Sequence, residues 1–149
     1  MRVTRFRAAL TGVAVIAGSV TGLALSAPAA NADSRYNCGD NPPAGMFSMF
    51  YDSKAYGYGA EADFCGSIPN FAGYTFNNTA YGTAGEGKSV KNNASAMEVT
   101  DETSEYRVYY NSWYGGPYQT IHSYDGDPAV DLASQLKNND ASAKYLGND

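Results

Sequence analysis

The chain has 149 residues, with 15 Asp and Glu against 10 Lys and Arg, and its formal net charge is −5. An acidic chain without clustered bases argues against a nucleic-acid groove. Its 13 Tyr, 6 Phe and 1 Trp exclude a typical disordered composition, and the length predicts a single domain.

Residues 1–32 predict a secretory signal peptide. Arg2, Arg5 and Arg7 precede an apolar run over residues 8–25, and residues 30–32 form a small-x-small cleavage pattern. Because Gly and Thr dilute the run, a permanent membrane anchor is not expected. Cleavage leaves 117 residues and removes three Arg but no acid, so the net charge becomes −8. We expect an extracellular protein with no membrane contact after signal removal.

Two cysteines, Cys38 and Cys65, predict one disulfide. An even count in an exported chain favours a structural bridge over a thiol nucleophile or a metal ligand. A loop of roughly 28 residues would stabilise the fold by about 3–4 kcal/mol.

The first half of the mature chain predicts short strands and turns. Residues 33–45 read as an irregular lead-in, and 46–51 as a buried strand followed by a tight turn over 52–59. Residues 74–76 predict another short strand, and the Gly-rich segment 80–88 an exposed loop.

The second half predicts four more strands and one helix. The strands are expected at 95–100, 106–110, 118–123 and 142–146. A short helix is expected near residues 128–136, because Asp127 is a good N-cap, Pro128 suits the first helical position, and Val130, Leu132 and Leu136 form an uneven apolar stripe.

An internal repeat divides the domain formed by residues 46–149. Residues 51–57 resemble 110–116, and residues 91–96 resemble 138–143. The two halves are about 46–100 and 106–146. Each is predicted to contain, in order, a strand, a Tyr–Gly corner, a middle segment, an Asn-rich Ala-Ser turn and a strand. The aromatic before the Gly is expected to pack over the corner. Because neither half can cover its own apolar face, we expect an all-β sandwich of two sheets.

The order of these corners and turns, repeated twice, resembles the βγ-crystallin double Greek-key fold. Within that fold, residues 90–95, 108–116 and 138–142 are most similar to a family of small secreted bacterial proteins that inhibit metallopeptidases. The resemblance covers roughly residues 46–146. It implies a monomeric binding protein that blocks a protease cleft and performs no chemistry of its own.

The chain departs from that family in its cysteines. Ser48 stands where members often carry a Cys, and a second bridge that rigidifies the protease-binding loop has no counterpart. Since preorganisation lets a loop bind tightly, two other functions stay open: a structural or calcium-binding crystallin-like extracellular protein, and a cell-wall or polysaccharide binder.

The resemblance also implies where calcium would bind, although no cofactor is required. Paired turns of the pattern Asx-Asx-x-x-Ser/Thr-Ser supply oxygen ligands. The matching residues are Asn92, Ser95, Asn138, Asn139 and Ser142. Lys91 at the first position of one turn opposes a dication, and Ala96 and Ala143 replace the final Ser.

A partner loop is predicted at residues 77–88, because the segment is small, polar and Gly-rich. Its candidate contact residues are Asn77, Asn78, Tyr81 and Glu86. The expected partner is a secreted protease.

No residue set predicts an enzyme. His122, near Ser123 and Asp125, is read as a polar residue of an edge strand, and a single His disfavours catalytic zinc. The acidic runs at 98–105 and 125–131 read as solvated faces rather than glycosidase carboxylates.

Exposed aromatics offer a sugar-stacking platform as an alternative. Its candidates are Trp113, Tyr114 and Tyr118, for which packing at the corner of the repeat is favoured.

Overall fold

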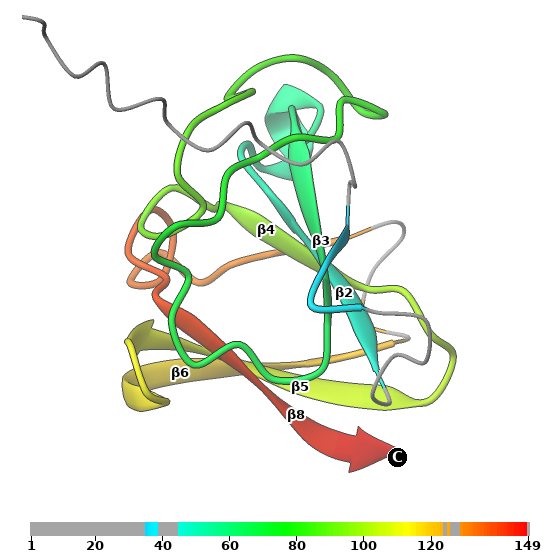
Figure 1. Cartoon of the computed structure of the whole chain (residues 1–149), viewed down its shortest axis with the longest axis vertical. Coiled ribbons are helices and arrows are strands. Elements are labelled where there is room, and N and C mark those ends of the chain that lie inside the picture. The colour runs from blue at the N-terminus through cyan, green and yellow to red at the C-terminus, as the bar shows by residue number, and fades with distance from the viewer. Residues whose placement is uncertain (1–34, 39–44, 124, 126–128, 149) are drawn as a thin grey trace, which may run out of the picture. The chain divides into compact units, whose positions relative to one another are not determined.

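The computed structural model describes residues 35–38, 45–123, 125 and 129–148 (Figure 1). The predicted signal peptide, together with Asp127 and Pro128, lies outside these residues. Among the described helices, none has the length and apolar character to span a membrane.

Five strands form the first sheet, in the order β1-β3-β2-β4-β7. Their bounds are Arg35–Tyr36 (β1), Met46–Phe50 (β2), Glu61–Cys65 (β3), Ala96–Val99 (β4) and Val130–Asp131 (β7). β1 runs parallel to β3, and the other pairs are antiparallel. The central strand β2 buries apolar side chains on both of its faces. Phe47 and Met49 enter the main core, and Phe50 packs with Tyr58 in a second cluster.

Three antiparallel strands form the second sheet, in the order β6-β5-β8. They are Ser104–Asn111 (β5), Gly115–His122 (β6) and Ser142–Asn148 (β8). Tyr106 and Val108 of β5 point into the core, two residues apart, as the pleat requires. The Tyr106 ring lies 4.7 Å from the Phe47 ring of the first sheet, so the two sheets share one aromatic core. This confirms the predicted all-β sandwich.

Each half of the chain also contributes a segment to the other sheet. β7 follows β6 in sequence but pairs with β4, through Met97 opposite Val130. In return, Ile68 follows β3 and bridges Ala143 of β8, with reciprocal N–O distances of 2.8 and 2.9 Å. Separating the two halves would therefore break hydrogen bonds in both sheets.

The two Asn-rich turns also bind each other reciprocally. The Asn92 amide donates to Asp140 O at 2.7 Å, and the Asn138 amide donates to Ala94 O at 2.8 Å. Asn92 and Asn138 both have left-handed backbones, with φ of 62° and 57°. Asn92 is therefore the structural equivalent of Asn138. The alignment of the two repeats in sequence pairs Lys91 with Asn138 and is wrong by one residue.

The predicted disulfide is confirmed. Cys38 and Cys65 are bonded, with their Cα atoms 4.9 Å apart. The bridge joins the chain just after β1 to the last residue of β3, and so fixes the parallel strand to the sheet edge.

Three local expectations are wrong. No helix occupies the described part of 128–136, because Val130 and Asp131 form β7 and the Leu132 amide donates to Ser95 O; the one described helix is a single 3-10 turn, Lys54–Tyr56. Residues 74–76 form only an isolated bridge, between Thr75 and Ser89. The lead-in is not wholly irregular, since it contains β1.

The corner aromatics also differ from expectation. Tyr56, before Gly57, is 79% exposed, and Tyr58 packs against Phe50 instead, at a ring separation of 5.1 Å. Trp113 is 74% exposed. Tyr114, the aromatic before Gly115, is half-buried and packs against Tyr109 at a ring separation of 5.9 Å, so the expectation fails at the first corner and for Trp113.

Asp140 gives the fold a pH dependence. Its carboxyl group is fully buried, one oxygen accepts the Ala94 amide at 3.0 Å, and the other has no hydrogen-bond partner among the described residues. Burial raises the pKa of Asp140 to about 8. The folded chain therefore holds a proton that the unfolded chain releases near pH 4, and stability falls as pH rises from about 4 to 8.

We predict that the free energy of unfolding of Asp140→Asn depends less on pH than that of the wild type. The difference is a few kcal/mol, because each unit of pKa shift is worth ~1.4 kcal/mol. Urea unfolding of both proteins at pH 5 and pH 8 measures it. Glu102→Gln, at an exposed residue, is the control and should retain the wild-type slope. An unchanged slope in Asp140→Asn would refute the assignment.

Candidate functional site

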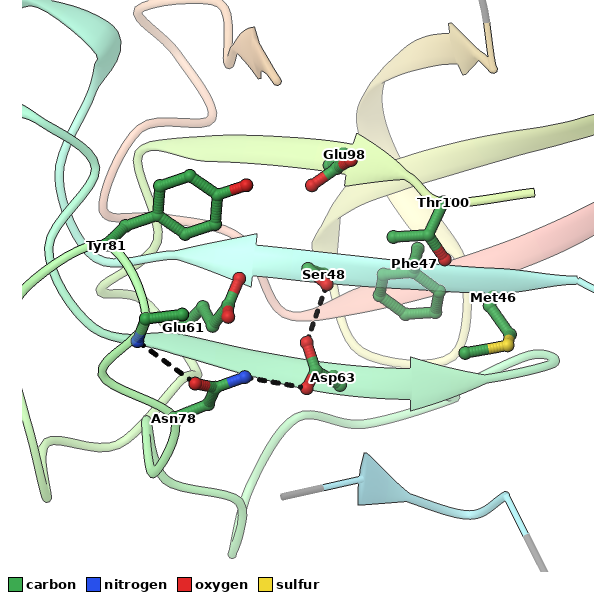
Figure 2. Close-up of a pocket in the computed structure, with 10 residues that line it drawn as sticks. Met46, Phe47, Ser48, Glu61, Asp63, Asn78, Tyr81, Glu98 and Thr100 are labelled. Carbon is green, nitrogen blue, oxygen red and sulfur yellow. Dashed lines mark hydrogen bonds between the residues drawn. The ribbon is translucent and has the colours of Figure 1, made fainter. Parts of the chain in front are cut away.

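A cavity of about 310 Å³ opens on the first sheet, on the face turned away from the core (Figure 2). It lies over β2, β3 and β4, and the segment after Asn78 forms one of its walls. The lining residues are Met46, Phe47, Ser48, Glu61, Asp63, Asn78, Ala80, Tyr81, Glu98 and Thr100.

Strand alternation places three carboxylates in this cavity. Ala62 and Phe64 of β3 enter the core, so Glu61 and Asp63 point to the opposite face. In the register, Ser48 of β2 lies opposite Asp63 on one side and Glu98 of β4 on the other. The acidic pocket, defined by Glu61, Asp63 and Glu98, is thus built from two strands on either side of β2.

Asp63 is held in place by two donors. The Ser48 hydroxyl donates to one carboxylate oxygen at 2.6 Å, and the Asn78 amide donates to the other at 3.1 Å (Figure 2). Asn78 belongs to the predicted partner loop, so this contact joins the loop to the pocket.

Glu61 is only 5% exposed. Burial, followed by the negative charges of Asp63 and Glu98, raises its pKa to about 7, against the opposing effect of the Asn78 amide. None of the residues lining the cavity in the described structure is Lys, Arg or His. The described residues that line the cavity therefore include three acids and no base.

Backbone hydrogen bonds fix the predicted partner loop, residues 77–88. Its ends bind Glu61 and Phe76: the Glu61 amide donates to Asn78 O at 2.8 Å, and the Gly87 amide to Phe76 O at 2.8 Å. Its middle accepts the Ala60 amide at Ala84 O, also at 2.8 Å. The loop is thus irregular and exposed, yet tied to the sheet along its length.

The four predicted contact residues occupy different places on this loop. Asn77 and Asn78 are half-buried at its base, and Glu86 is exposed. Tyr81 is 45% exposed, and its ring packs edge-on against Phe50 at 5.4 Å. The loop therefore presents Tyr81 and Glu86, while its asparagines anchor it.

Gly85 lets the loop close onto the sheet. Its φ is 83°, and a Cβ there would collide with the Tyr51 ring. Gly87 has a similar φ of 76° but open space around it. We predict that Gly85→Ala costs ~1–3 kcal/mol more than Gly87→Ala, because both incur backbone strain and only the first clashes.

Thermal or urea unfolding of the two glycine variants measures this difference. Gly87→Ala serves as the matched control for left-handed backbone strain. If Gly85→Ala and Gly87→Ala have equal free energies of unfolding, the contact between the loop and the Tyr51 ring is not rigid.

The residues predicted for calcium are only partly brought together. Asn92 and Asn139 line a second hollow of about 260 Å³, and Ser95, Asn138 and Ser142 do not. The Lys91 ammonium lies beside this hollow, where it donates to Ser112 Oγ at 2.9 Å and Asn70 Oδ1 at 3.1 Å.

Ser142 is occupied by the β5–β6 corner. Its hydroxyl donates to Asn111 O at 2.8 Å and accepts the Tyr114 amide at 3.1 Å. In the described ranges, no group of three or more His, Cys, Asp or Glu is placed to hold a metal ion. Calcium binding stays a prediction.

His122 lies beside two acidic side chains. Its Nδ1 lies 2.9 Å from Asp125 Oδ2, and its Nε2 lies 3.9 Å from Glu105 Oε1. Ser123 directly follows His122, in the turn after β6.

The sugar-platform residues lie along the β5–β6 hairpin. Trp113 and Tyr114 both have left-handed backbones, with φ of 62° and 63°. Tyr118 is 52% exposed, with the Arg107 guanidinium 4.2 Å from its ring centre.

Sequence reasoning missed Glu61 and Asp63 and assigned Glu98 to a solvated run. The available signal was the alternation of acidic and apolar residues over 61–64. It predicts one polar strand face, but only the register across three strands shows that these acids meet.

Comparison with known proteins rests on structure alone, since no family model and no curated protein matches the sequence. A solved structure from work on the evolution of the eye-lens βγ-crystallin domain fold is similar, with a TM-score of 0.51, 11% identity, and coverage of 73% of this chain and 93% of that chain. The fold is that of a βγ-crystallin-like domain.

Two further βγ-crystallins were found. One from an archaeon has a TM-score of 0.45, 16% identity, and coverage of 70% of this chain and 100% of that chain. One from Ciona intestinalis has a TM-score of 0.46, 14% identity, and coverage of 68% and 100%. At these identities the similarity concerns the fold.

Proposed function

We propose that this chain is a secreted binding protein that blocks an extracellular peptidase without chemistry of its own. The observation that carries the proposal is the loop at 77–88, which is exposed at Tyr81 and Glu86 but anchored by backbone hydrogen bonds at its ends and middle. A loop that is ordered before binding loses little entropy in a cleft, which favours tight association.

This anchoring supplies what the absent second disulfide would otherwise provide. Two contacts hold the loop: the Asn78 amide is bonded to Asp63, and Gly85 closely approaches the Tyr51 ring. The loop is therefore held to the sheet without a second disulfide bridge.

The proposal predicts stoichiometric inhibition of one peptidase class. Residual activity of metallopeptidases and serine peptidases is measured against titrated, oxidised protein expressed with its own leader, followed by gel analysis of its integrity. No inhibition across the panel at micromolar concentrations, or digestion of the loop, would contradict the proposal.

Charge reversal locates the contact surface. We predict that Glu86→Arg changes the inhibition constant by roughly tenfold, because a charged contact at an interface contributes on the order of 1 kcal/mol or more. Glu102→Arg, at an exposed residue outside the loop, is the matched control. Equal effects of the two variants would place the contact elsewhere.

A second candidate function is glycan binding, favoured by Trp113. A 74% exposed Trp held on a left-handed backbone is an unusual surface residue, and such strain is often retained at functional sites. Pull-down on insoluble glycans would then be lost in Trp113→Ala and kept in Tyr56→Ala, a variant of another exposed aromatic. Wild-type protein that fails to sediment with any glycan would dismiss this candidate.

A further inference from the structure

We infer that the outer face of the second sheet binds an acidic glycan, a polysaccharide whose sugars carry carboxylate or sulfate groups. The binding surface is the basic–aromatic face, defined by Arg107, Tyr109, Tyr114, Tyr118 and Lys144. The inference goes beyond peptidase inhibition and does not depend on it. It names the ligand class for the second candidate function, glycan binding, and rests on that candidate.

Strand alternation brings these side chains to one face of the sheet. Val108 of β5 enters the core, so its neighbours Arg107 and Tyr109 point outward. In the register, Tyr109 lies opposite Tyr118 of β6, and Arg107 lies opposite Lys144 of β8. Because residues that lie directly opposite each other share a face, Tyr118 and Lys144 point outward as well.

The first observation is a pair of like charges placed side by side. Arg107 and Lys144 occupy adjacent strands, whose backbones lie about 4.8 Å apart, and like charges directly opposite each other destabilise a sheet. Neither side chain forms a salt bridge in the described structure. Glu105, two residues before Arg107, lies beside His122 instead, with its Oε1 3.9 Å from His122 Nε2. An oxyanion bound between the two cations would offset their repulsion.

The second observation is a guanidinium that is held in place but keeps most of its donors. Arg107 Nε donates to Thr120 Oγ1 at 3.2 Å, and Arg107 Cζ lies 4.2 Å from the centre of the Tyr118 ring. These two contacts use one of the five N–H donors of the guanidinium. The other four have no hydrogen-bond partner among the described residues. Such a fork is preorganised for the paired oxygens of an anionic group.

The third observation is that aromatic rings continue the face beside the cations. Tyr118 is 52% exposed, and Lys144 Nζ lies 5.9 Å from the centre of the half-buried Tyr114 ring. Tyr114 and Tyr118 both pack on Tyr109, at ring separations of 5.9 and 5.7 Å. Trp113, the exposed residue that favours glycan binding, directly precedes Tyr114. The face therefore offers rings for stacking on a sugar and, next to them, cations for its anionic group.

The overall charge of the chain requires that any such binding be local. The net charge is −5, and it is −8 without the predicted signal peptide, so the protein as a whole repels a polyanion. Residues 33–149 contain seven bases, and two of them stand side by side on this face. Binding of an acidic glycan would therefore come from this site and not from general attraction.

The test titrates the oxidised protein, expressed with its own leader, with a soluble oligogalacturonate by calorimetry. EDTA is present so that calcium cannot bridge an acidic sugar to an acidic protein. The methyl ester of the same oligomer is the matched probe, because it keeps the sugar chain and removes the charge. Dextran sulfate paired with neutral dextran tests sulfate, and polyacrylate tests a polyanion that contains no sugar.

We expect saturable binding of at least one acidic glycan, at least tenfold tighter than that of its neutral counterpart and of polyacrylate. The acidic glycan with the higher affinity identifies the anionic group that the face prefers. This result would support the inference.

Variants locate the site. Arg107→Gln and Lys144→Gln should each weaken binding of the acidic glycan at least fivefold. Lys88→Gln, which removes the charge of an exposed lysine outside the face, is the matched control and should bind as the wild type does. Because Lys144 is exposed, its variant should keep the wild-type free energy of unfolding, so the test remains valid if Arg107→Gln fails to fold.

Three results would overturn the inference: no saturable binding of either acidic glycan, equally tight binding of polyacrylate, or unchanged binding in Lys144→Gln. Equal binding of the neutral counterparts would overturn it as well but leave the candidate function of glycan binding intact. Binding of an acidic glycan by a protein that inhibits no peptidase would overturn only the first proposed function.

Discussion

The exchange of hydrogen-bonded segments between the two sheets is the constraint on which the rest of the structure depends. β7 completes the edge of the first sheet, Ile68 completes that of the second, and the Asn-rich turns bind each other at Asn92 and Asn138. With few aliphatic side chains, the core is filled by rings such as Phe47, Phe64 and Tyr106. These rings require both sheets at once, so the two halves are expected to fold together.

This interlocking leaves the outer face of the first sheet available for binding. The inner face is committed to the core through Ala62, Phe64 and Met97, and strand alternation then turns Asp63 and Glu98 outward. The long connection between β3 and β4 passes over this face and is fastened to it at Asn78 and Ala84. A pocket and a preorganised loop therefore arise from the same connection.

Much of the fold is predictable from local pattern, and the remainder depends on tertiary pairing. β2, β4, β5, β6 and β8 carry apolar or aromatic periodicity, and their positions follow from it. β7 has two residues and the Ile68 bridge has one, too few for any pattern. No helix forms in the described part of 128–136, because pairing of Val130 with Met97 outweighs the capping signal in the sequence.

The candidate site divides in the same way. Asn78, Tyr81 and Glu86 could be singled out because a Gly-rich polar loop is recognisable in sequence. Glu61 and Asp63 could not, because their meeting with Glu98 depends on the register of three strands. Exposure of Trp113 could not be predicted from its backbone either, since Tyr58 and Trp113 share a left-handed conformation but are 6% and 74% exposed.

Native-state hydrogen exchange tests most directly whether the loop at 77–88 is ordered before it meets a partner. The informative amides are those of Ala60, Glu61 and Gly87, which donate to Ala84 O, Asn78 O and Phe76 O. A preorganised loop predicts protection of these amides within roughly tenfold of that of the β5 amides. Exchange near the rate of an unstructured chain would show that the loop opens freely and would contradict the account.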